Sequence, residues 1–444
     1  MFLYRIIPKN AKQPAFIIIS MIFIAVSDII SAAGLIASAV ITAGYVRISK
    51  RLRKKRAVFF SATAFLMLFY AAGFIGYSLY SINRFDSAHS FLRFCPAALS
   101  FFYIQAVRFA ADIYKGRIRR LPDINDTMDY LLFYPRLVMG PVMTYSEHIT
   151  MLKNNRDTCE RTGEGLSLFI IGLSKKVLIA DTIGLVFGPF YGRLSDDSTL
   201  LMAWLTVLAF ALELFFSLSG YGDMAKGAAL CYGFDVPVSY GSPLLSGSLS
   251  RFHDEWNISV ISWFKSLFGI MLRPGRWQYI AGTAAVWIFF AMWYRPDPQM
   301  IIWGAWIGLW IGLDGYVRDK FSRVPSVING IVFFLAMFFG WAFFSAGSIP
   351  EGINAAALLL GKSASIARAN DLYFIKTAGV IMIIAVYSAS GNFGVLLRQA
   401  RRIPFLSRLI DLSGVIVQAV LLILCLVVLT TNSDIMALHM KGVM

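Results

Sequence analysis

The side chains that could move a proton at neutral pH are few in this chain of 444 residues. An imidazole suits that task because its reference pKa is about 6.5. The four histidines are His89, His148, His253 and His439. We expect His89 and His439 in loops or the tail, and His148 in a loop beside a cavity. Glu213 is a candidate of another kind, for the lining of a functional interior, because an ionisable group within an apolar stretch is costly and therefore marks a functional position.

The composition places these residues in a membrane protein. Of the sequence, 58% is apolar, 15% aromatic and 15% charged, and the mean hydropathy is +0.66. An average soluble domain is about 45–50% apolar and about 25% charged, so the excess apolar surface needs lipid as its solvent. We interpret the net charge of +16 as a signal of membrane topology and expect no nucleic acid among the partners.

The cysteines and the N-terminal segment add two expectations. The four cysteines are spread without a Cys-x-x-Cys pair, so we expect neither a disulfide framework nor a metal site. The N-terminal segment carries Arg5, Lys9 and Lys12 before an apolar run, without the cleavage site of a signal peptide. We therefore interpret it as the start of an uncleaved first membrane segment.

About ten or eleven apolar runs reach or approach the length of about 20 residues that a spanning helix needs. The runs are Ala15–Val26, Ile29–Val46, Ala57–Ile82, Phe94–Ile113, Leu166–Phe190, Leu200–Leu218, Gln278–Tyr294, Met300–Leu313, Ile328–Ala346, Leu372–Ser390 and Ser413–Thr431. The densest basic clusters lie at 47–56, 115–120, 318–323 and 398–408. We expect these clusters on the cytoplasmic side. The pattern predicts one all-α polytopic membrane domain over residues 1–444.

Two segments resist a simple spanning interpretation. Tyr130–Ile149 is interrupted by Pro135 and by Gly140-Pro141, and Tyr221–Leu249 is rich in glycine, serine and proline. Non-helical backbone at membrane depth is tolerated only where it is buried in protein or lines a cavity. We therefore expect broken or re-entrant segments at these two places, with a functional interior beside them.

Four motifs in and around these segments resemble those of a known family. They are LSFFYIQAVRFAADIYKGRI (Leu99–Ile118), FYPRLVMGP (Phe133–Pro141), IIGLSKKVLIAD (Ile170–Asp181) and SGYGDMAKGAALCYGF (Ser219–Phe234). In order and spacing they resemble the membrane-bound O-acyltransferases, specifically the bacterial branch of alginate O-acetylation and D-alanyl-teichoate transfer proteins. The resemblance runs from about residue 90 to about residue 350, and it implies a helical membrane fold around a central tunnel.

Two further motifs resemble the family but lack its histidines. FHDEWNISVISWF (Phe252–Phe264) has Asn257 where the family has a histidine. MWYRPDPQMIIWG (Met292–Gly304) has Tyr294 at the position of the family's best-supported catalytic histidine, which takes the proton of the acceptor hydroxyl. Asparagine does not titrate. Tyrosine, with a reference pKa of about 10, is a poor base unless a cation such as the neighbouring Arg295 lowers that value, and adjacent side chains often diverge.

His253 is a candidate for the missing base. It precedes Asn257 by four residues, so a continuous helix would place both on one face, about 6 Å apart. The imidazole would then have moved by one helical turn. The alternative is a surface or capping residue, because the two acidic residues that follow His253 are typical of an exposed helix start.

The resemblance also implies residues that line the tunnel or contact substrate. They are Glu213, Ser219, Tyr221, Asp223, Trp256 and Trp293. Glu213 replaces the family's usual glutamine, and Asp223 matches a family aspartate that we expect to cap a break beside a glycine-rich turn. Trp256 and Trp293 flank the two substituted positions and are expected in the cavity wall. The alternative for tryptophans in such a chain is helix packing.

The resemblance implies a divergent O-acyltransferase of a bacterial cell membrane. It would move a short acyl group from acetyl-CoA or an acyl-carrier thioester to a hydroxyl of an exported polysaccharide or cell-wall polymer. We expect no bound cofactor, and an extracytoplasmic acetylation protein as a partner. The substituted histidines favour an inactive homologue that serves as a binding or partner subunit, so the sequence leaves enzymatic activity open. A secondary transporter is a third hypothesis, which no internal symmetry supports.

Overall fold

The structure, a computed structural model, covers most of the chain. It describes residues 4, 6–27, 29–52, 64–65, 68, 97–118, 122–137, 139–268, 277–295, 297–320, 325–363, 365–391, 396 and 399–431. These residues form helices and no strand, which confirms the predicted all-α class. Most of the predicted run Ala57–Ile82 lies outside the described residues, as do His89 and His439.

The chain divides into two compact units. The first contains the described residues up to Phe169 and Tyr221–Pro237, and the second contains Ile170–Gly220 and the described residues from Val238 onward. The chain passes between the units within helices α9 (Cys159–Ser174) and α11 (Leu200–Cys231), and again in the non-helical segment after α11, at Pro237–Val238. That the whole chain forms one domain stays a prediction.

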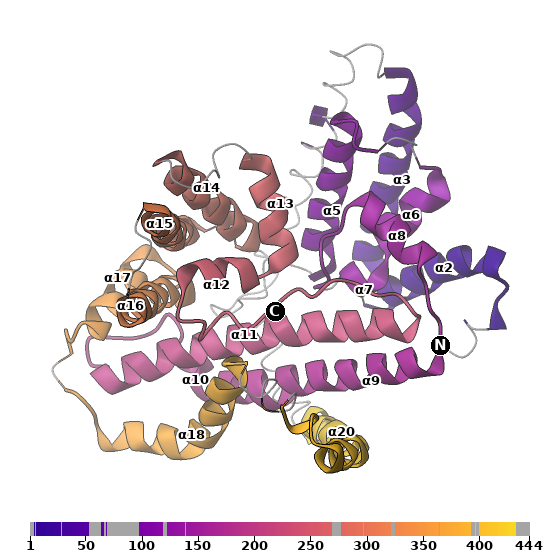
Figure 1. The fold of residues 1–444 in the computed structure, drawn as a ribbon. Coiled ribbons are helices and arrows are strands. Elements are labelled where there is room, and N and C mark those ends of the chain that lie inside the picture. The colour runs from indigo at the N-terminus through magenta and orange to yellow at the C-terminus, as the bar shows by residue number, and fades with distance from the viewer. Residues whose placement is uncertain are drawn as a thin grey trace. The chain divides into compact units, whose positions relative to one another are not determined.

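The first unit is built around the apolar faces of several helices. Its elements are α2 (Lys9–Ser27), α3 (Ile29–Leu52), α5 (Ala97–Tyr114), α6 (Ile124–Leu132), α7 (Tyr134–Leu137), α8 (Tyr145–Lys153) and the adjoining parts of α9 and α11 (Figure 1). Both α2 and α3 contact α6, and Phe109, Tyr130 and Leu131 are buried in this core. The described residues between α7 and α8 are not helical, so the break predicted within Tyr130–Ile149 is confirmed.

The second unit is built around buried aromatic rings. Its elements are η1 (Lys175–Ala180), α10 (Asp181–Phe187), η2 (Gly188–Phe190), α12 (Leu249–Glu255), α13 (Ile258–Phe268), α14 (Trp277–Tyr294), α15 (Pro298–Lys320), α16 (Ser326–Ser345), α17 (Ile349–Leu359), α18 (Ala369–Ala389), α20 (Pro404–Thr431) and the remaining parts of α9 and α11. Trp256, Trp287, Trp303 and Trp341 are among its fully buried side chains. The segment η1 is a π-helical turn, a conformation that is frequent at functional sites.

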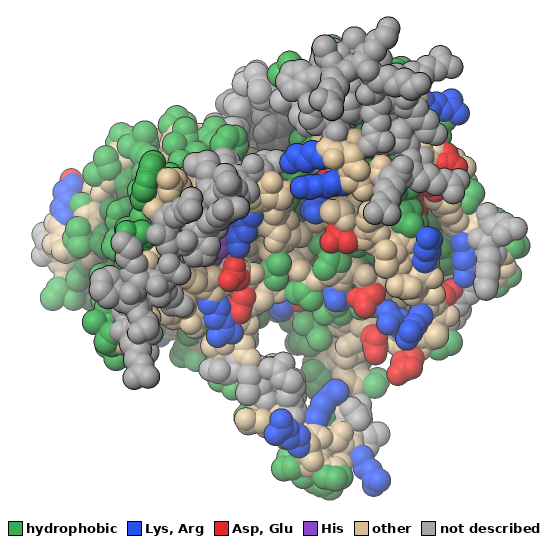
Figure 2. Space-filling model, turned by 45° about the horizontal axis from the view of Figure 1, so that its top comes forward, with side chains coloured by type: hydrophobic (Ala, Val, Ile, Leu, Met, Phe, Trp, Pro, Cys, Tyr) green, Lys and Arg blue, Asp and Glu red, His purple; other side chains and the backbone are tan. Residues whose placement is uncertain are grey.

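Five helices among the described residues are long and apolar enough to cross a membrane. They are Leu200–Cys231, Pro298–Val317, Val327–Ser345, Ala369–Ala389 and Pro404–Thr431. The most apolar stretch of α20 has only 6% of its residues buried, so nearly all of its hydrophobic side chains face outward, as lipid contact requires. Figure 2 shows hydrophobic side chains over much of one face of the molecule. The predicted polytopic architecture is confirmed, whereas the total of ten or eleven spans stays a prediction.

The break predicted from Tyr221 onward is wrong for its first part. Helix α11 continues through this region to Cys231. Its glycines allow close packing and do not form a turn, because a Cβ atom at Gly227 would lie 2.6 Å from the carbonyl oxygen of Gly165 in α9. Asp223 therefore lies inside a helix, and the predicted capping of a break by Asp223 is wrong.

Glycines at every fourth position bring α15 against α14. Cβ atoms at Gly304, Gly308 and Gly312 would lie 2.6, 2.6 and 2.7 Å from backbone atoms of α14. This spacing of small residues lets the backbones of membrane helices approach closely. The close approach fixes α14, which carries Tyr294 at its last position.

Candidate functional site

Asn257 occupies a sharp break between two helices. The side chain of Ser248 caps α12 by accepting a hydrogen bond from the backbone N–H of Arg251, and the helix ends at Glu255. Asn257 follows with a φ of 40°, in the left-handed region that asparagine tolerates better than most residues. The continuous helix predicted through His253 and Asn257 is therefore wrong, and the two side chains do not share a helical face.

His253 is buried inside the second unit, so the alternative of an exposed helix start is also wrong. The residue is 5% exposed, and its Nδ1 accepts a hydrogen bond of 2.9 Å from Nε1 of Trp287. A ring that accepts at Nδ1 is neutral and carries its proton on Nε2. Burial, and secondarily the charge of Lys265, lowers the pKa of His253 well below its ordinary value. The imidazole is thus held neutral and in one tautomer.

Trp256 packs into a group of rings that we name the aromatic cluster. The cluster consists of Phe252, Trp256, Trp287, Trp303, Trp341 and Phe344. The ring of Trp256 stacks on Phe252 with centroids 5.2 Å apart and contacts Trp341 at 5.4 Å. Asn257, next to it in the chain, is 2% exposed. Trp256 therefore contributes to helix packing, and its place in a tunnel wall stays a prediction.

Tyr294 ends α14 and contacts the same cluster. Its ring centroid lies 5.5 Å from that of Phe344. The guanidinium of the next residue, Arg295, turns to the link between α16 and α17. There it donates hydrogen bonds to the carbonyl oxygens of Phe344 and Ala346, at 3.3 and 2.9 Å, and it pairs with Asp297 at 2.7 Å. Arg295 thus anchors this link and is not dedicated to activating Tyr294.

The three predicted catalytic residues meet at the aromatic cluster. Tyr294 and His253 each contact one of its rings, and Asn257 follows another in the chain. The ring of Trp293 lies 6.3 Å from that of Tyr294 and is half-buried. The structure therefore brings the motif residues together, and it arranges them around packed rings. Their catalytic roles stay predictions.

The other predicted tunnel residues lie on α11 but belong to different units. Glu213 and Ser219 are in the second unit, whereas Tyr221 and Asp223 are half-buried in the first. The carboxylate of Glu213 lies against α10, because a Cβ atom at Gly184 would be 2.6 Å from its Oε1. Its Oε2 and the Oγ of Ser219 are buried, and neither has a hydrogen-bond partner within the described part of the chain. Buried polar atoms of this kind point to water, ligand or catalysis.

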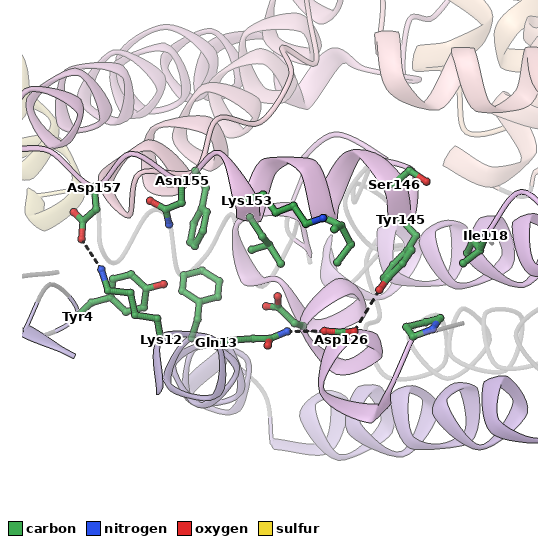
Figure 3. Close-up of a pocket in the computed structure, with 16 residues that line it drawn as sticks. Tyr4, Lys12, Gln13, Ile118, Asp126, Tyr145, Ser146, Lys153, Asn155 and Asp157 are labelled. Carbon is green, nitrogen blue, oxygen red and sulfur yellow. Dashed lines mark hydrogen bonds and ion pairs between the residues drawn. The ribbon is translucent and has the colours of Figure 1, made fainter. Parts of the chain in front are cut away.

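The first unit contains a pocket of about 1110 Å³, whose lining residues the sequence did not reveal. Side chains of α2, α6 and α8, and of the segment after α8, line it (Figure 3). Lys12 pairs with Asp157 across 3.2 Å, and Asp126 accepts hydrogen bonds from Gln13 and Tyr145. Acids, amides, hydroxyls and lysines together suit a polar ligand that both donates and accepts hydrogen bonds.

His148 lies behind the wall of this pocket. It is fully buried, and its Nε2 is 3.4 Å from Oδ2 of Asp129, which lines the pocket. Burial, and secondarily the charge of Arg136, lowers the pKa of His148 to about 4. The loop predicted for His148 is wrong, because a capping box of Thr144 and Glu147 starts α8 there. The cavity predicted beside it agrees with the pocket.

More than half of the chain matches a known protein family. Residues 99–348 match the model of the MBOAT, membrane-bound O-acyltransferase family. The chain belongs to the membrane-bound O-acyltransferase family. The matched range contains Glu213, His253, Asn257 and Tyr294, and it confirms the resemblance between about residue 90 and about residue 350.

Similar proteins with curated names are acyltransferases of bacteria. The chain is 28% identical over 270 residues to the probable alginate O-acetylase AlgI of Pseudomonas putida, a match that covers 60% of this chain and 54% of the relative. It is 25% identical over 313 residues to the peptidoglycan O-acetyltransferase of Helicobacter pylori, covering 63% and 59%. It is 20% identical over 270 residues to the teichoic acid D-alanyltransferase of Bacillus subtilis, covering 56% and 68%. The chain spans about half the length of the alginate O-acetylases that it matches.

Membership in the membrane-bound O-acyltransferase family agrees with the apolar helices. With five helices able to cross a membrane, the protein is an integral membrane protein, which confirms the predicted location. Within the part of the chain that the structure describes, no group of three or more His, Cys, Asp or Glu side chains could hold a metal ion.

Proposed function

We propose that this protein transfers a short acyl group, such as acetyl, from a thioester to a hydroxyl of an exported polysaccharide or cell-wall polymer. The observation that carries this proposal is the family match over residues 99–348, which includes every predicted site residue. The named relatives support the acceptor class, because their names refer to alginate, peptidoglycan and teichoic acid. The donor is acetyl-CoA or an acyl-carrier thioester, and an extracytoplasmic acetylation protein is the expected partner.

Acyl transfer to a hydroxyl needs a group that accepts the hydroxyl proton. Tyr294 would need a nearby cation to act as this base, and the guanidinium of Arg295 is bound to two carbonyl oxygens and to Asp297. His253 is equally unsuited, since its Nδ1 accepts the indole proton of Trp287. Tyr294 remains placed to contact substrate at the end of α14, and the base must be sought elsewhere.

A second candidate is an inactive homologue that serves as a binding or partner subunit. The observation in its favour is the aromatic cluster, whose rings pack against the positions of Asn257 and Tyr294. A protein that no longer needs a base at these two positions could fill them with packed side chains. Measured acyl transfer separates the two candidates.

The test uses the purified full chain in proteoliposomes with radiolabelled acetyl-CoA. Alginate oligosaccharides and peptidoglycan fragments serve as acceptors, and release of CoA and labelling of the acceptor are measured. We expect transfer that depends on the protein and that Tyr294→Phe reduces. Tyr373→Phe is the matched control, because this tyrosine is 62% exposed and lies outside the matched range.

Two results would favour the inactive homologue. If the unchanged protein shows no transfer but the Asn257→His, Tyr294→His double variant does, the chain has kept the site and lost its base. If neither protein transfers acetyl to any acceptor while both remain folded, more than the base has been lost. In both cases the transferase proposal for the unchanged protein is wrong.

A further inference from the structure

One face of helix α11 carries polar atoms that are buried without partners. Oγ1 of Thr206 and Oε2 of Glu213 are both buried, and no hydrogen bond joins either of them to another described residue. The two residues are seven positions apart, so they project from nearly the same side of the helix. Phe210 lies between them on this side. Such atoms are rare in native proteins, and one explanation for them is a catalytic role.

Tyr191 approaches this face from the segment after η2. Its ring lies 5.2 Å from that of Phe210, and its buried hydroxyl, which makes no other hydrogen bond, adjoins the carboxylate of Glu213. Burial, and secondarily the charge of Glu213, raises the pKa of Tyr191 well above its ordinary value. The hydroxyl therefore stays protonated and is available as a hydrogen-bond donor to the carboxylate.

Among the described residues, no Lys or Arg side chain forms an ion pair with Glu213. The cation that acts on Glu213 is Lys176 of the π-helical segment η1. The ammonium of Lys176 pairs with the carboxylate of Asp181 in α10. The missing side chain of Gly184 in α10 makes room for Oε1, because a Cβ atom there would lie 2.6 Å from it. A carboxylate that is buried in a membrane span is costly, and such a residue is a candidate for function.

A chain of rings connects this carboxylate to the position of Tyr294. Phe210 contacts Tyr191 at 5.2 Å and Phe344 at 5.5 Å, and Phe344 contacts Tyr294 at 5.5 Å. Glu213 therefore lies in the same aromatic layer of the second unit as the residue that stands where the family has its catalytic histidine. In this layer Glu213 is a titratable side chain whose acceptor oxygen is not already engaged.

We propose that Glu213 is the general base of the acyl transfer, in place of the histidines that the family resemblance leads one to expect. This inference rests on the proposed function. The acceptor oxygen attacks the carbonyl carbon of the thioester while Oε2 of Glu213 takes the hydroxyl proton. The new C–O bond forms, the C–S bond breaks, and the thiolate leaving group receives the proton from Glu213. Tyr191 positions the carboxylate and stabilises its charged form.

The test is the acetyl-transfer assay with Glu213→Gln in the full chain. The amide has nearly the same shape, and the resemblance indicates glutamine as the family's usual residue here, so the fold should be retained. We expect kcat to fall by about 100-fold or more with little change in the thermal unfolding temperature. Glu160→Gln, at an exposed glutamate in the first turn of α9, is the matched control and should keep full activity.

The pH dependence distinguishes a base from a structural carboxylate. The unchanged protein should lose activity as the pH falls through the titration of Glu213. Tyr191→Phe removes a donor that favours the charged carboxylate, so the acidic limb of the profile should move to higher pH. Glu213→Asp should keep an acidic limb with reduced kcat.

The outcomes separate this inference from the proposed function. Absence of transfer by the unchanged protein overturns both. Transfer by the unchanged protein that survives in Glu213→Gln overturns the assignment of the base and leaves the transferase. If Glu213→Gln fails to fold, the position of the acidic limb in Tyr191→Phe decides, and an unshifted limb overturns the assignment.

Discussion

The indole Nε1 of Trp287 donates a hydrogen bond of 2.9 Å to Nδ1 of His253 and so ties α14 to α12. Trp287 is 0% exposed and His253 is 5% exposed, so water does not compete for this bond. The proton of the neutral ring then sits on Nε2, and neither nitrogen has a free lone pair for a substrate proton. We infer that His253 is a structural residue, in contrast to its proposed part in catalysis.

Replacing His253 with alanine should therefore lower stability more than intrinsic activity. The change leaves the indole N–H of Trp287 buried without an acceptor, which costs about 1–3 kcal/mol of the free energy of unfolding, in addition to the cavity. Thermal unfolding in detergent measures this loss. In a double-mutant cycle with Trp287→Phe, the hydrogen bond should appear as a coupling energy of about 0.5–3 kcal/mol. Additive effects, or lost transfer by fully folded His253→Ala, would contradict the structural role.

The contact of α15 with α14 predicts a large difference between two glycine substitutions. A Cβ atom at Gly308 would lie 2.6 Å from the backbone Cα of Ala284, so one helix must shift, and we expect Gly308→Ala to destabilise by about 1–3 kcal/mol. Gly330 on α16 is the control, because a Cβ atom there has no neighbour within 4 Å. Gly330→Ala should be neutral or stabilise by up to about 1 kcal/mol. Equal unfolding temperatures for the two variants would contradict close packing.

Glycine also explains where the fold could not be predicted from sequence. The apolar runs predicted the helices, since a run of that length and composition has few other ways to satisfy its backbone in lipid. A glycine in such a run, however, can either end the helix or let a second helix pack closely against it. Gly227 lies in the segment predicted to be broken, whereas its missing side chain makes room for the backbone of α9. The choice depends on a partner helix that local sequence does not contain.

The candidate site shows the same division between local and distant information. Asn257 and Tyr294 could be located from motifs, because each motif is short and continuous. The helix that carries His148 was not predicted, although the spacing of Thr144 and Glu147 in a capping box is a local signal for its start. The pocket was not, because ion pairs such as Lys12 with Asp157 join residues 145 positions apart. Only the folded chain brings such residues together.

The left-handed backbone at Asn257 predicts an order among substitutions there. Glycine adopts a φ of 40° without strain, and histidine tolerates this region better than most residues. We expect Asn257→Gly and Asn257→His to unfold close to the temperature of the unchanged protein. Asn257→Val should lose about 1–2 kcal/mol from the backbone conformation, because a side chain branched at Cβ opposes it. Similar losses for glycine and valine would show that side-chain contacts, not backbone strain, decide stability at this position.

His148 predicts a loss of stability in mild acid. Burial lowers its pKa to about 4, whereas the pKa in the unfolded chain is about 6.5. Between these values the unfolded chain binds the proton and the folded chain does not, so the free energy of unfolding falls as the pH decreases. The neutral ring contributes fully to the free energy of unfolding above about pH 6.5, and this contribution is lost as the pH falls toward 4. For a pKa shift of this size the loss is about 3 kcal/mol. Unfolding temperatures measured between these pH values report it.

His148→Gln is the variant that isolates this effect, because glutamine does not titrate and keeps a polar group near Asp129. It should be less stable than the unchanged protein at pH 7.5, since it loses the packing of the ring against Tyr130 and Phe133, at centroid distances of 5.5 Å each. Its stability should nevertheless depend less on pH between about 6.5 and 4. The two curves should therefore converge as the pH falls. Parallel curves would mean that His148 becomes protonated within the fold, and that Asp129 at 3.4 Å then holds it as an ion pair.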